Sequence, residues 1–389
     1  MVRKADQMKI SEIKTCGLRG ATPEGGWTHE HGPDDVIHTL IAVHTDEGVI
    51  GVGSCYSSEA LVRAALELLT PLVVGADPRE PERVSQTLAA HTFWMGRGGA
   101  VAHAISGIDI ALWDILGQTA GLSVGMLLGG VYRSRVRPYA SLLVDDPAPL
   151  RDTLHEIAAD GFHAFKIGWG GFGRRDSRYD EDVVAAARDA IGPDALLAVD
   201  AGGSDGFWAG RSAWAIRTSA MLADYDVAWF EEALAPDDIE GYTALRARAG
   251  VPIAGGEVLT RRQDFARCMR AGAFDIVQPD TTKSGGLSES RRVAWLAEEF
   301  GVQLIPHGWN TAVGLSADLH LASAVAGTDL VEYRTGSAYI DGLLETPPEL
   351  DADGMLAVPE GPGLGIRLSQ EALDRWGTRP DLLRPSVSR

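Results

Sequence analysis

The 389-residue sequence predicts an α/β protein in which a β/α barrel follows a smaller α+β unit. Polar side chains recur through the second half of the chain, mostly at the ends of short apolar runs, at intervals of 31, 26, 23, 27 and 25 residues. Such an interval is about the length of one strand, one helix and two short loops, which is the repeat of a barrel. Strand-like and helix-like segments also alternate from Val136 onward, whereas residues 1–130 place strands first and helices afterwards.

The N-terminal part has the pattern of a small sheet followed by helices. We expect strands over residues 8–19 and 36–55, and helices over residues 58–73, 81–92 and 100–119. Val36–Thr45 is rich in β-branched residues, and Asp46–Gly48 provides a turn within the second strand segment. Ile105, Ile108 and Leu112 are spaced as on one face of a helix. This part is therefore predicted to be an α+β unit.

The alternation that follows predicts a parallel sheet or barrel. Ala164–Ile167 is an apolar strand, and helices are expected over residues 180–191, 211–224, 239–249, 261–272, 287–300 and 314–325. After about Thr346 the alternation stops, and the Pro-rich remainder is too short to be a domain alone. We expect it to pack against the N-terminal unit. The predicted organisation is an N-terminal unit over residues 1–130, a barrel over 131–346 and a C-terminal segment over 347–389.

Composition excludes some classes of partner. The chain has 54 acidic and 35 basic residues, a formal net charge of −19, and no basic stretch, which argues against nucleic acid and anionic membranes. No continuous apolar run approaches 18 residues, so neither a signal peptide nor a membrane span is expected. Cys16, Cys55 and Cys268 are widely spaced, which fits packed thiols in a reducing, cytoplasmic location.

The recurring polar side chains are the candidate site. They are Asp200, Glu231, Glu257, Asp280, His307 and Glu332. Because catalytic groups of a barrel sit at the carboxyl ends of successive strands, these six are expected to converge at one mouth. One carboxylate there could merely cap the next helix, but three need a cation, and hard oxygen ligands select Mg²⁺ or Mn²⁺ over zinc. Asp200, Glu231 and Glu257 are therefore predicted to bind the metal. Glu232 should point to the opposite side of its strand, in a structural role.

Two further features predict acid–base chemistry. Asp280 and His307 end neighbouring predicted strands, and a carboxylate beside an imidazole fixes its tautomer and raises its pKa, giving a general base and acid. Lys166 ends an apolar strand much earlier in the chain. An ammonium group in a barrel mouth must pair with carboxylates or an anionic substrate, the alternative being an exposed surface lysine.

Several motifs together resemble one known family. They are Gly107–Asp114, Gly161–Lys166, Trp229–Glu232, Gly255–Glu257, Gln278–Asp280, Ile305–His307 and Gly361–Gly365. With the polar residues in this order, the chain resembles the mandelate racemase subgroup of the enolase superfamily over essentially its whole length. The resemblance implies a modified (β/α)7β TIM-like barrel, and a capping domain made of the N-terminal unit and the C-terminal tail. It also implies one Mg²⁺ and removal of the proton next to a carboxylate, to give a metal-stabilised enediolate.

The chain departs from that subgroup at two places. The subgroup usually carries Lys-x-Lys at the end of the second barrel strand, and here Lys166 matches the first lysine while Gly168 replaces the second. Residues 166 and 168 share one face of the strand, so the amine that serves as a base is missing there. The subgroup's Asp-x-Asn after the third strand appears as Asp200-Ala201-Gly202, without the amide.

These departures favour a reaction with one base. His307 can remove the proton at C2 and then protonate a hydroxyl leaving from C3, which is dehydration of a sugar acid to a 2-keto-3-deoxy acid. Lys166 would neutralise the developing enediolate, and Glu332 would hydrogen bond to the substrate carboxylate. Opening of a lactone or anhydro ring by a cycloisomerase is the alternative, as is a racemase or epimerase if Lys166 acts as a second base. Expected partners are a small carboxylate substrate and further copies of the chain.

Other classes predict different features. A metal-dependent aldolase or decarboxylase would not need the pair of Asp280 and His307, and a non-catalytic binding protein would be expected to lack metal ligands. Substrate identity depends on Ala21–Asp35, Gly51–Ser57 and Trp309–Asn310. Candidates for contact with the distal end of the sugar are Trp27, His29, Glu30, His31 and Arg97.

Overall fold

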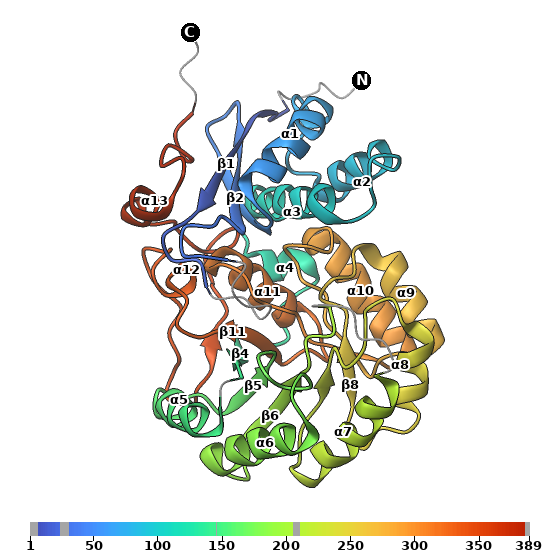
Figure 1. The fold of residues 1–389 in the computed structure, drawn as a ribbon. Helices are drawn as coiled ribbons and strands as arrows, with labels where there is room; N and C mark the ends of the chain where they lie inside the picture. The colour runs from blue at the N-terminus through green and yellow to red at the C-terminus, as the bar shows by residue number, and fades with distance from the viewer. Residues whose placement is uncertain (1–6, 24–30, 145, 205–210, 386–389) are drawn as a thin grey trace.

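The computed structural model describes residues 7–23, 31–144, 146–204 and 211–385. Two units are stacked on each other, with the small sheet and its helices at one end and the barrel at the other (Figure 1). The described part of the chain begins and ends on the side of the small unit (Figure 1). The small unit therefore covers one end of the barrel.

The small unit is an antiparallel sheet packed on helices. Its elements are β1 (Ile10–Leu18), β2 (His38–Thr45), β3 (Ile50–Tyr56), α1 (Glu59–Val73), α2 (Pro81–His91), α3 (Gly99–Ala120) and α4 (Val124–Leu128), with strand order β1-β2-β3. Helix α3 lies very close to β3, because a Cβ atom at Gly51 or Gly53 would lie 2.0 Å from a carbonyl oxygen of that helix. These two glycines allow the contact that joins sheet and helix.

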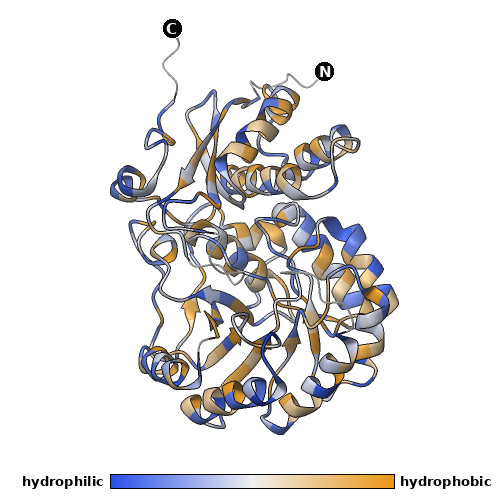
Figure 2. Cartoon of the chain, in the orientation of Figure 1, coloured by the Kyte–Doolittle hydropathy of each residue, from blue (hydrophilic) through white to orange (hydrophobic). Residues whose placement is uncertain are grey.

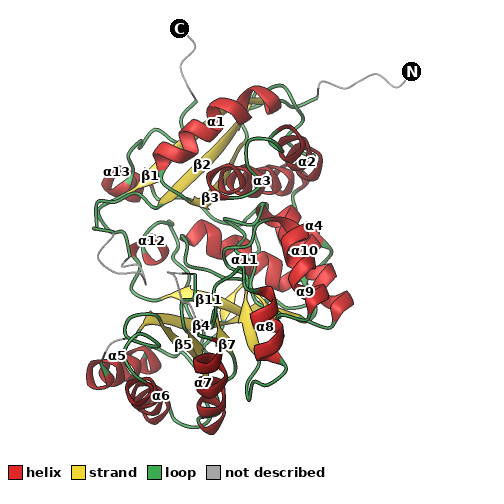
Figure 3. Cartoon of the chain, turned by 45° about the vertical axis from the view of Figure 1, so that its right-hand side comes forward, coloured by secondary structure: helices red, strands yellow, loops and turns green. Residues whose placement is uncertain are grey.

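Among the described residues the barrel has eight parallel strands, and each of the first seven is followed by a helix. Figure 3 shows the strands on the inside and helices around them. The strands are β4 (Arg135–Leu143), β5 (Ala164–Gly168), β6 (Leu196–Asp200), β7 (Phe230–Glu231), β8 (Ile253–Gly255), β9 (Ile276–Val277), β10 (Gln303–Leu304) and β11 (Leu330–Arg334). The helices are α5 (Pro147–Ala159), α6 (Ser177–Ile191), α7 (Ser212–Asp224), α8 (Ile239–Arg246), α9 (Arg261–Ala271), α10 (Gly286–Phe300) and α11 (Ala312–Ala324). Strand β11 is followed by the four-residue α12 (Ala338–Asp341) and then by the C-terminal tail, not by a full barrel helix, so the predicted (β/α)7β fold is confirmed.

The barrel interior is filled by side chains, which form the floor beneath the strand ends. One buried cluster takes a residue from each strand or its flank: Tyr139, Ala164, Ala198, Trp229, Ala254, Ile276, Ile305 and Leu330. Tyr139 and Trp229 meet edge to face, with ring centroids 5.4 Å apart. Val199 follows Ala198 and Phe230 follows Trp229, and both belong instead to the larger core beneath the helices. Figure 2 shows the strands mostly hydrophobic and the outer helices with hydrophilic segments.

The helices predicted from sequence agree with the structure to within a few residues, but the prediction omitted α5 and three short helices, α4, α12 and α13 (Gln370–Trp376). The prediction placed no helix between the first two barrel strands, where α5 begins at Pro147. Proline suits the first turn of a helix, since its missing N–H has no partner there. The predicted strand over residues 36–55 is the hairpin of β2 and β3.

The C-terminal tail contacts both units. Its strand β12 (Leu356–Ala357) pairs antiparallel with the start of β4, at the amino-terminal end of the barrel. Its helix α13 (Gln370–Trp376) lies beside β1, where the amide of Arg19 donates to the carbonyl of Trp376 at 3.0 Å. The tail therefore reaches the small unit, as expected from sequence, but only after it has added a strand to the barrel.

Helix α3 is the central helix of the small unit. Among the described residues it is the one helix long and apolar enough to cross a membrane by composition, and 72% of its most apolar window is buried inside the protein. It carries Asp109 and Asp114, both buried. Asp109 accepts hydrogen bonds from the amide of Ser288 at 2.9 Å and its hydroxyl at 2.6 Å, so this polar contact ties the small unit to α10. The three cysteines are buried and free, as expected.

Candidate active site

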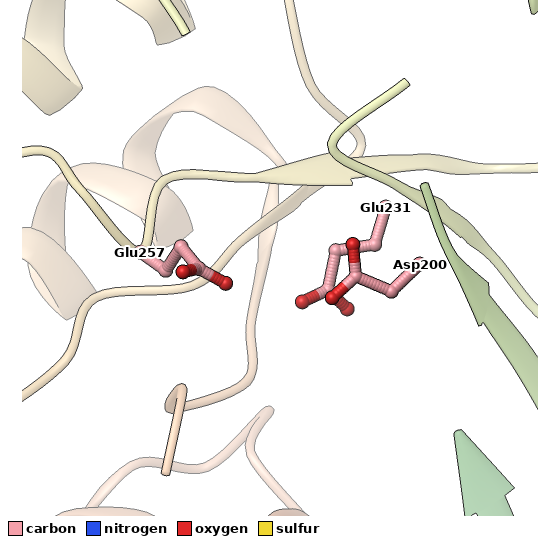
Figure 4. A group of neighbouring side chains, drawn as sticks. All are labelled: Asp200, Glu231 and Glu257. Atoms are coloured by element: carbon pink, nitrogen blue, oxygen red, sulfur yellow. The ribbon is translucent and has the colours of Figure 1, made fainter. Parts of the chain in front are cut away.

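Three carboxylates predicted to bind metal meet at the carboxyl ends of adjacent strands. Asp200 and Glu231 are the last residues of β6 and β7, and Glu257 lies two residues after β8. One oxygen from each of the three lies within 4.8 Å of the others. Figure 4 shows Asp200 and Glu231 side by side, with Glu257 facing them from the other side. All three are buried, so the sheet geometry brings together what the sequence spacing predicted.

Hydrogen bonds from neighbouring groups orient two of these carboxylates. Asp200 accepts from the indole N–H of Trp169 at 3.0 Å and from the amide of Gly202 at 2.7 Å. Glu231 Oε2 accepts from Gln278 at 2.7 Å and from the indole of Trp229 at 2.9 Å. Carboxylates fixed in this way are preorganised ligands, because their partners prevent rotation away from the site.

The charge balance of the site requires a further cation. Six buried carboxylates cluster here, namely Asp200, Glu231, Glu232, Glu257, Asp280 and Glu332. If all six were ionised, they would exceed the two buried lysines and one histidine that oppose them among the described residues by three or four charges. Burial and the carboxylates of Glu257 and Asp200 hold the pKa of Glu232 well above its ordinary value, which reduces this excess. Burial, together with neighbouring carboxylates, raises the pKa of Asp200 and Glu231, although Lys166 opposes the shift. A divalent ion held by the three oxygen ligands fits this donor set and this charge.

Lys166 is buried among carboxylates and is not a surface residue. Its Nζ lies 2.6 Å from Glu231, 3.0 Å from Glu332 and 3.6 Å from Asp200. Burial alone would lower the pKa of this ammonium, but the surrounding carboxylates outweigh it and hold the pKa well above its ordinary value. Lys166 is therefore a fixed positive charge at the wall of the site.

Asp280 and His307 form a dyad on adjacent strand ends. Asp280 Oδ2 lies 2.8 Å from His307 Nδ1, and its other oxygen accepts from the amide of Thr282 at 2.7 Å. The Nδ1 proton is thereby directed to Asp280, which leaves Nε2 for chemistry. Nε2 lies 3.3 Å from Glu257. Burial lowers the pKa of His307, but Glu257, Glu332 and Asp280 raise it to about 9.

Glu332 accepts a hydrogen bond, and its neighbours favour its charged form. Its Oε2 accepts from the amide of Gly308 at 2.8 Å. Burial raises its pKa, but Lys166 and His307 outweigh burial and lower the pKa to about 2. The hydrogen bond from Glu332 to a substrate carboxylate, as predicted from sequence, needs a proton on Glu332. Because the pKa of Glu332 is lowered, its side chain lacks this proton before an anionic substrate binds.

A cavity of about 500 Å³, counted with its open mouth, lies above these groups. It is lined by Tyr56, Ser141, Leu142, Leu143, Lys166, Gly168, Trp169, Asp200, Glu257, Lys283, His307, Trp309 and Glu332. Tyr56 ends β3, so the small unit supplies part of the wall. Tyr56 is thus the residue of Gly51–Ser57, a segment on which substrate identity is expected to depend, that lines this cavity.

The sequence interpretation missed Lys283. This buried residue lies on the loop between β9 and α10, with its Nζ 3.5 Å from Asp280 and 3.9 Å from Glu257. It also lies over the ring of Tyr56, 4.5 Å from the centroid. The sequence signal that could have identified Lys283 is its place three residues after Asp280, because the loop that follows a barrel strand lies at the same mouth as the strand end.

Gly168 has a steric reason to be glycine. A Cβ atom there would lie 2.5 Å from the carbonyl oxygen of Asp200 and 2.6 Å from its Cβ. No second lysine fits at this backbone position. Glu232, given a structural role from sequence, has a φ of 42° and accepts from the amide of Ser204 at 3.1 Å. It is buried and does not line the cavity.

The candidates for distal contact have different outcomes. Trp27, His29 and Glu30 lie outside the described residues. His31 is half-buried but does not line the cavity. Arg97 was a poor candidate, because it is exposed, stacks over Phe93 and lines a separate depression near α2 and α3.

Comparison with known proteins identifies relatives over the whole fold. Residues 34–129 match the model of the mandelate racemase/muconate lactonizing enzyme N-terminal domain, and residues 150–372 match that of the enolase C-terminal domain-like family. The chain is 36% identical to D-galactarolactone cycloisomerase of Agrobacterium fabrum, over 95% of this chain and 99% of that protein. It is 33% identical to D-galactonate dehydratase of Ralstonia nicotianae, over 89% and 93% of the two chains.

Among solved structures, the chain is similar to the 3,6-anhydro-D-galactonate cycloisomerase from Zobellia galactanivorans. The TM-score is 0.85 and the sequence identity 30%, with 95% of this chain and all of that chain covered. The fold of this chain is thus shared with a solved structure over almost its whole length.

Proposed function

Because the chain belongs to the mandelate racemase/muconate lactonizing enzyme family of the enolase superfamily, we propose that it is a metal-dependent enzyme that eliminates an oxygen substituent from a sugar acid. The observation that carries the proposal is the pair of Asp280 and His307, with Nε2 directed to a cavity that also holds Lys166 and the three-carboxylate cluster. When bound by Asp200, Glu231 and Glu257, Mg²⁺ or Mn²⁺ supplies positive charge that makes the C–H bond next to a carboxylate more acidic.

The proton transfers need one base. His307 Nε2 takes the proton from C2, and the electron pair of the C2–H bond forms a C2–C3 double bond as the C3–O bond breaks. Asp280 stabilises the resulting imidazolium through Nδ1. When the leaving group is a hydroxyl, His307 then gives the proton to its oxygen, which departs as water. Lys166 balances the negative charge that develops on the carboxylate. The enol product tautomerises to a 2-keto-3-deoxy acid.

Of the two possible eliminations, ring opening and loss of water, we place ring opening first. The relative at 36% identity and the solved structure at 30% identity are both named cycloisomerases that act on lactone or anhydro forms of sugar acids. When the leaving oxygen belongs to a lactone it departs as a carboxylate, which needs no proton, so one histidine suffices. Loss of water, placed first by the sequence interpretation, is the second candidate, supported by 33% identity to D-galactonate dehydratase.

Racemisation fits the site less well. Interconversion of two C2 epimers needs a base on each face of the substrate. Position 168 is glycine, and Lys166 is held charged by three carboxylates. A protonated amine in that setting stabilises charge and is a poor base.

The proposal is tested with two sets of substrates in deuterated water with Mg²⁺. One set holds lactones and anhydro forms of sugar acids, and the other holds open-chain sugar acids. Appearance of a 2-keto-3-deoxy acid by NMR from the first set supports a cycloisomerase, and from the second a dehydratase. Epimerised substrate without keto acid would refute elimination and identify a racemase.

A further inference from the structure

Trp169 occupies an unusual position at the end of β5. Side chains alternate along a strand, so after the inward Lys166 and Gly168 the next residue should point away from the cavity. The backbone of Trp169 has a φ of 60°, in the left-handed region that non-glycine residues rarely adopt. Trp169 consequently lines the same cavity as its two neighbours, and it is 8% exposed.

A glycine on the next strand end makes room for this indole. A Cβ atom at Gly202 would lie 2.5 Å from the Trp169 ring, so any larger side chain there would displace it. Gly168, directly before Trp169, lies against the backbone of Asp200. The amide that the loop lacks at 202 is therefore connected with Trp169, because the indole fills the volume that a side chain at 202 would need.

The indole acts on a metal ligand. Its N–H donates to Asp200 Oδ2 at 3.0 Å, and the amide of Trp169 donates to the carbonyl of Asp200 at 3.0 Å. The guanidinium of Arg174 lies 5.9 Å from the ring centroid and donates to the carbonyl of Ala201 at 3.3 Å. The β6 end is thus held by side chains from the β5–α6 segment.

Trp169 and His307 act on different ligands of the cluster. Trp169 contacts Asp200, whereas His307 lies 3.3 Å from Glu257. Figure 4 shows these two carboxylates facing each other from opposite sides. A substrate bound at the cluster would therefore have the imidazole on one side and the flat apolar surface of the indole on the other.

We propose that Trp169 is a positioning and specificity-determining residue that replaces a second base. Its N–H orients Asp200 for the metal, and its ring forms the wall on which the C–H face of a cyclic sugar acid stacks. The second role rests on the proposed function, and the first does not. The ring also keeps water and proton donors away from the substrate face opposite His307. Proton transfer is thereby restricted to the face on the His307 side.

The test separates the two roles with three variants of the full-length protein. Trp169→Phe keeps a ring and removes the N–H. Without substrate, calorimetry should show Mn²⁺ binding weaker by about 10- to 100-fold, the usual effect of losing a partner that orients a ligand. Trp169→Leu also removes the ring, and KM for a cyclic substrate should rise about 3- to 10-fold above that of Trp169→Phe. Trp309→Phe is the control, since Trp309 lines the same cavity and stacks on Arg334; its Mn²⁺ affinity should not change.

The outcomes separate this inference from the proposed function. Wild-type Mn²⁺ affinity in Trp169→Phe would overturn the positioning role, and KM values equal in Trp169→Phe and Trp169→Leu would overturn the stacking role. Circular dichroism and thermal melting check folding, and Trp169→Met replaces Trp169→Leu if the latter does not fold. A wild-type protein that binds Mn²⁺ but converts none of the cyclic or open-chain acids would refute the proposed function and leave the calorimetric result standing.

Discussion

Substitution of Gly168 by alanine should weaken metal binding, although residue 168 is not expected to touch the metal. Gly168 pairs with Asp200 across β5 and β6. An added Cβ would lie 2.5 Å from the Asp200 carbonyl oxygen and 2.6 Å from its Cβ, whereas ordinary contacts begin near 3.4 Å. The strands must separate by most of an ångström, and Asp200 moves with its strand.

The size of the effect follows from the cost of overpacking. Forcing an extra methyl group into a packed interior costs about 1–3 kcal/mol. If the displacement of Asp200 costs metal binding the same free energy, Mn²⁺ affinity falls by about 5- to 150-fold. The φ of Gly168 lies outside the left-handed region, so alanine adds steric contact without backbone strain.

The assay is calorimetric Mn²⁺ titration, combined with thermal melting with and without metal. Gly327→Ala is the matched control, because a Cβ atom at Gly327 would meet nothing within 4 Å and the φ there is ordinary. It should bind Mn²⁺ like the wild type. A Gly168→Ala protein with Mn²⁺ affinity within twofold of the wild type would refute the steric reasoning. The effect of glycine at 168 would then be limited to the missing lysine side chain.

Four further predictions concern metal, acid–base chemistry and stability. Exhaustive chelation should abolish activity and lower the melting temperature, and Mg²⁺ or Mn²⁺ should restore both; full activity after chelation would rule out the carboxylate cluster as a required metal site. His307→Asn should lose more than the ~10²–10⁴-fold typical of one proton transfer while substrate still binds, and retention of a tenth of the activity would point to another base. Since neutral His307 is the base and Asp280 raises its pKa, Asp280→Asn should move the rising limb of the kcat/KM profile to lower pH; an unmoved limb contradicts the dyad. Burial raises the pKa of Asp109 from 3.8 to about 7, so the folded state holds its proton more tightly than the unfolded state and stability should fall as the pH rises between these values, by up to about 4 kcal/mol. Denaturant unfolding of Asp109→Asn should lack this part of the slope, and an identical pH dependence in both proteins would contradict it.

The order of the elements and the set of polar residues at the mouth could be predicted from the sequence alone. Both depend on local pattern, because helix and strand periods are visible within a dozen residues and a barrel directs every strand end to one side. Asp200, Glu231 and Glu257 could therefore be grouped without coordinates, as could Asp280 with His307. The absence of a lysine at 168 was also visible, but its steric reason was not.

How the remaining side chains meet became visible only in the folded barrel. Trp169 enters the cavity through a φ of 60°, which no hydrophobic pattern predicts, and Lys283 is placed there by a loop that pairs it with Glu257. Arg97 looked available in sequence and lies in a different depression. The pKa of Glu332 is lowered by Lys166, whose Nζ lies 3.0 Å from it although the two residues are distant in the chain. These features depend on contacts between distant segments and on the burial of charge, and both exist only once the barrel has closed around them.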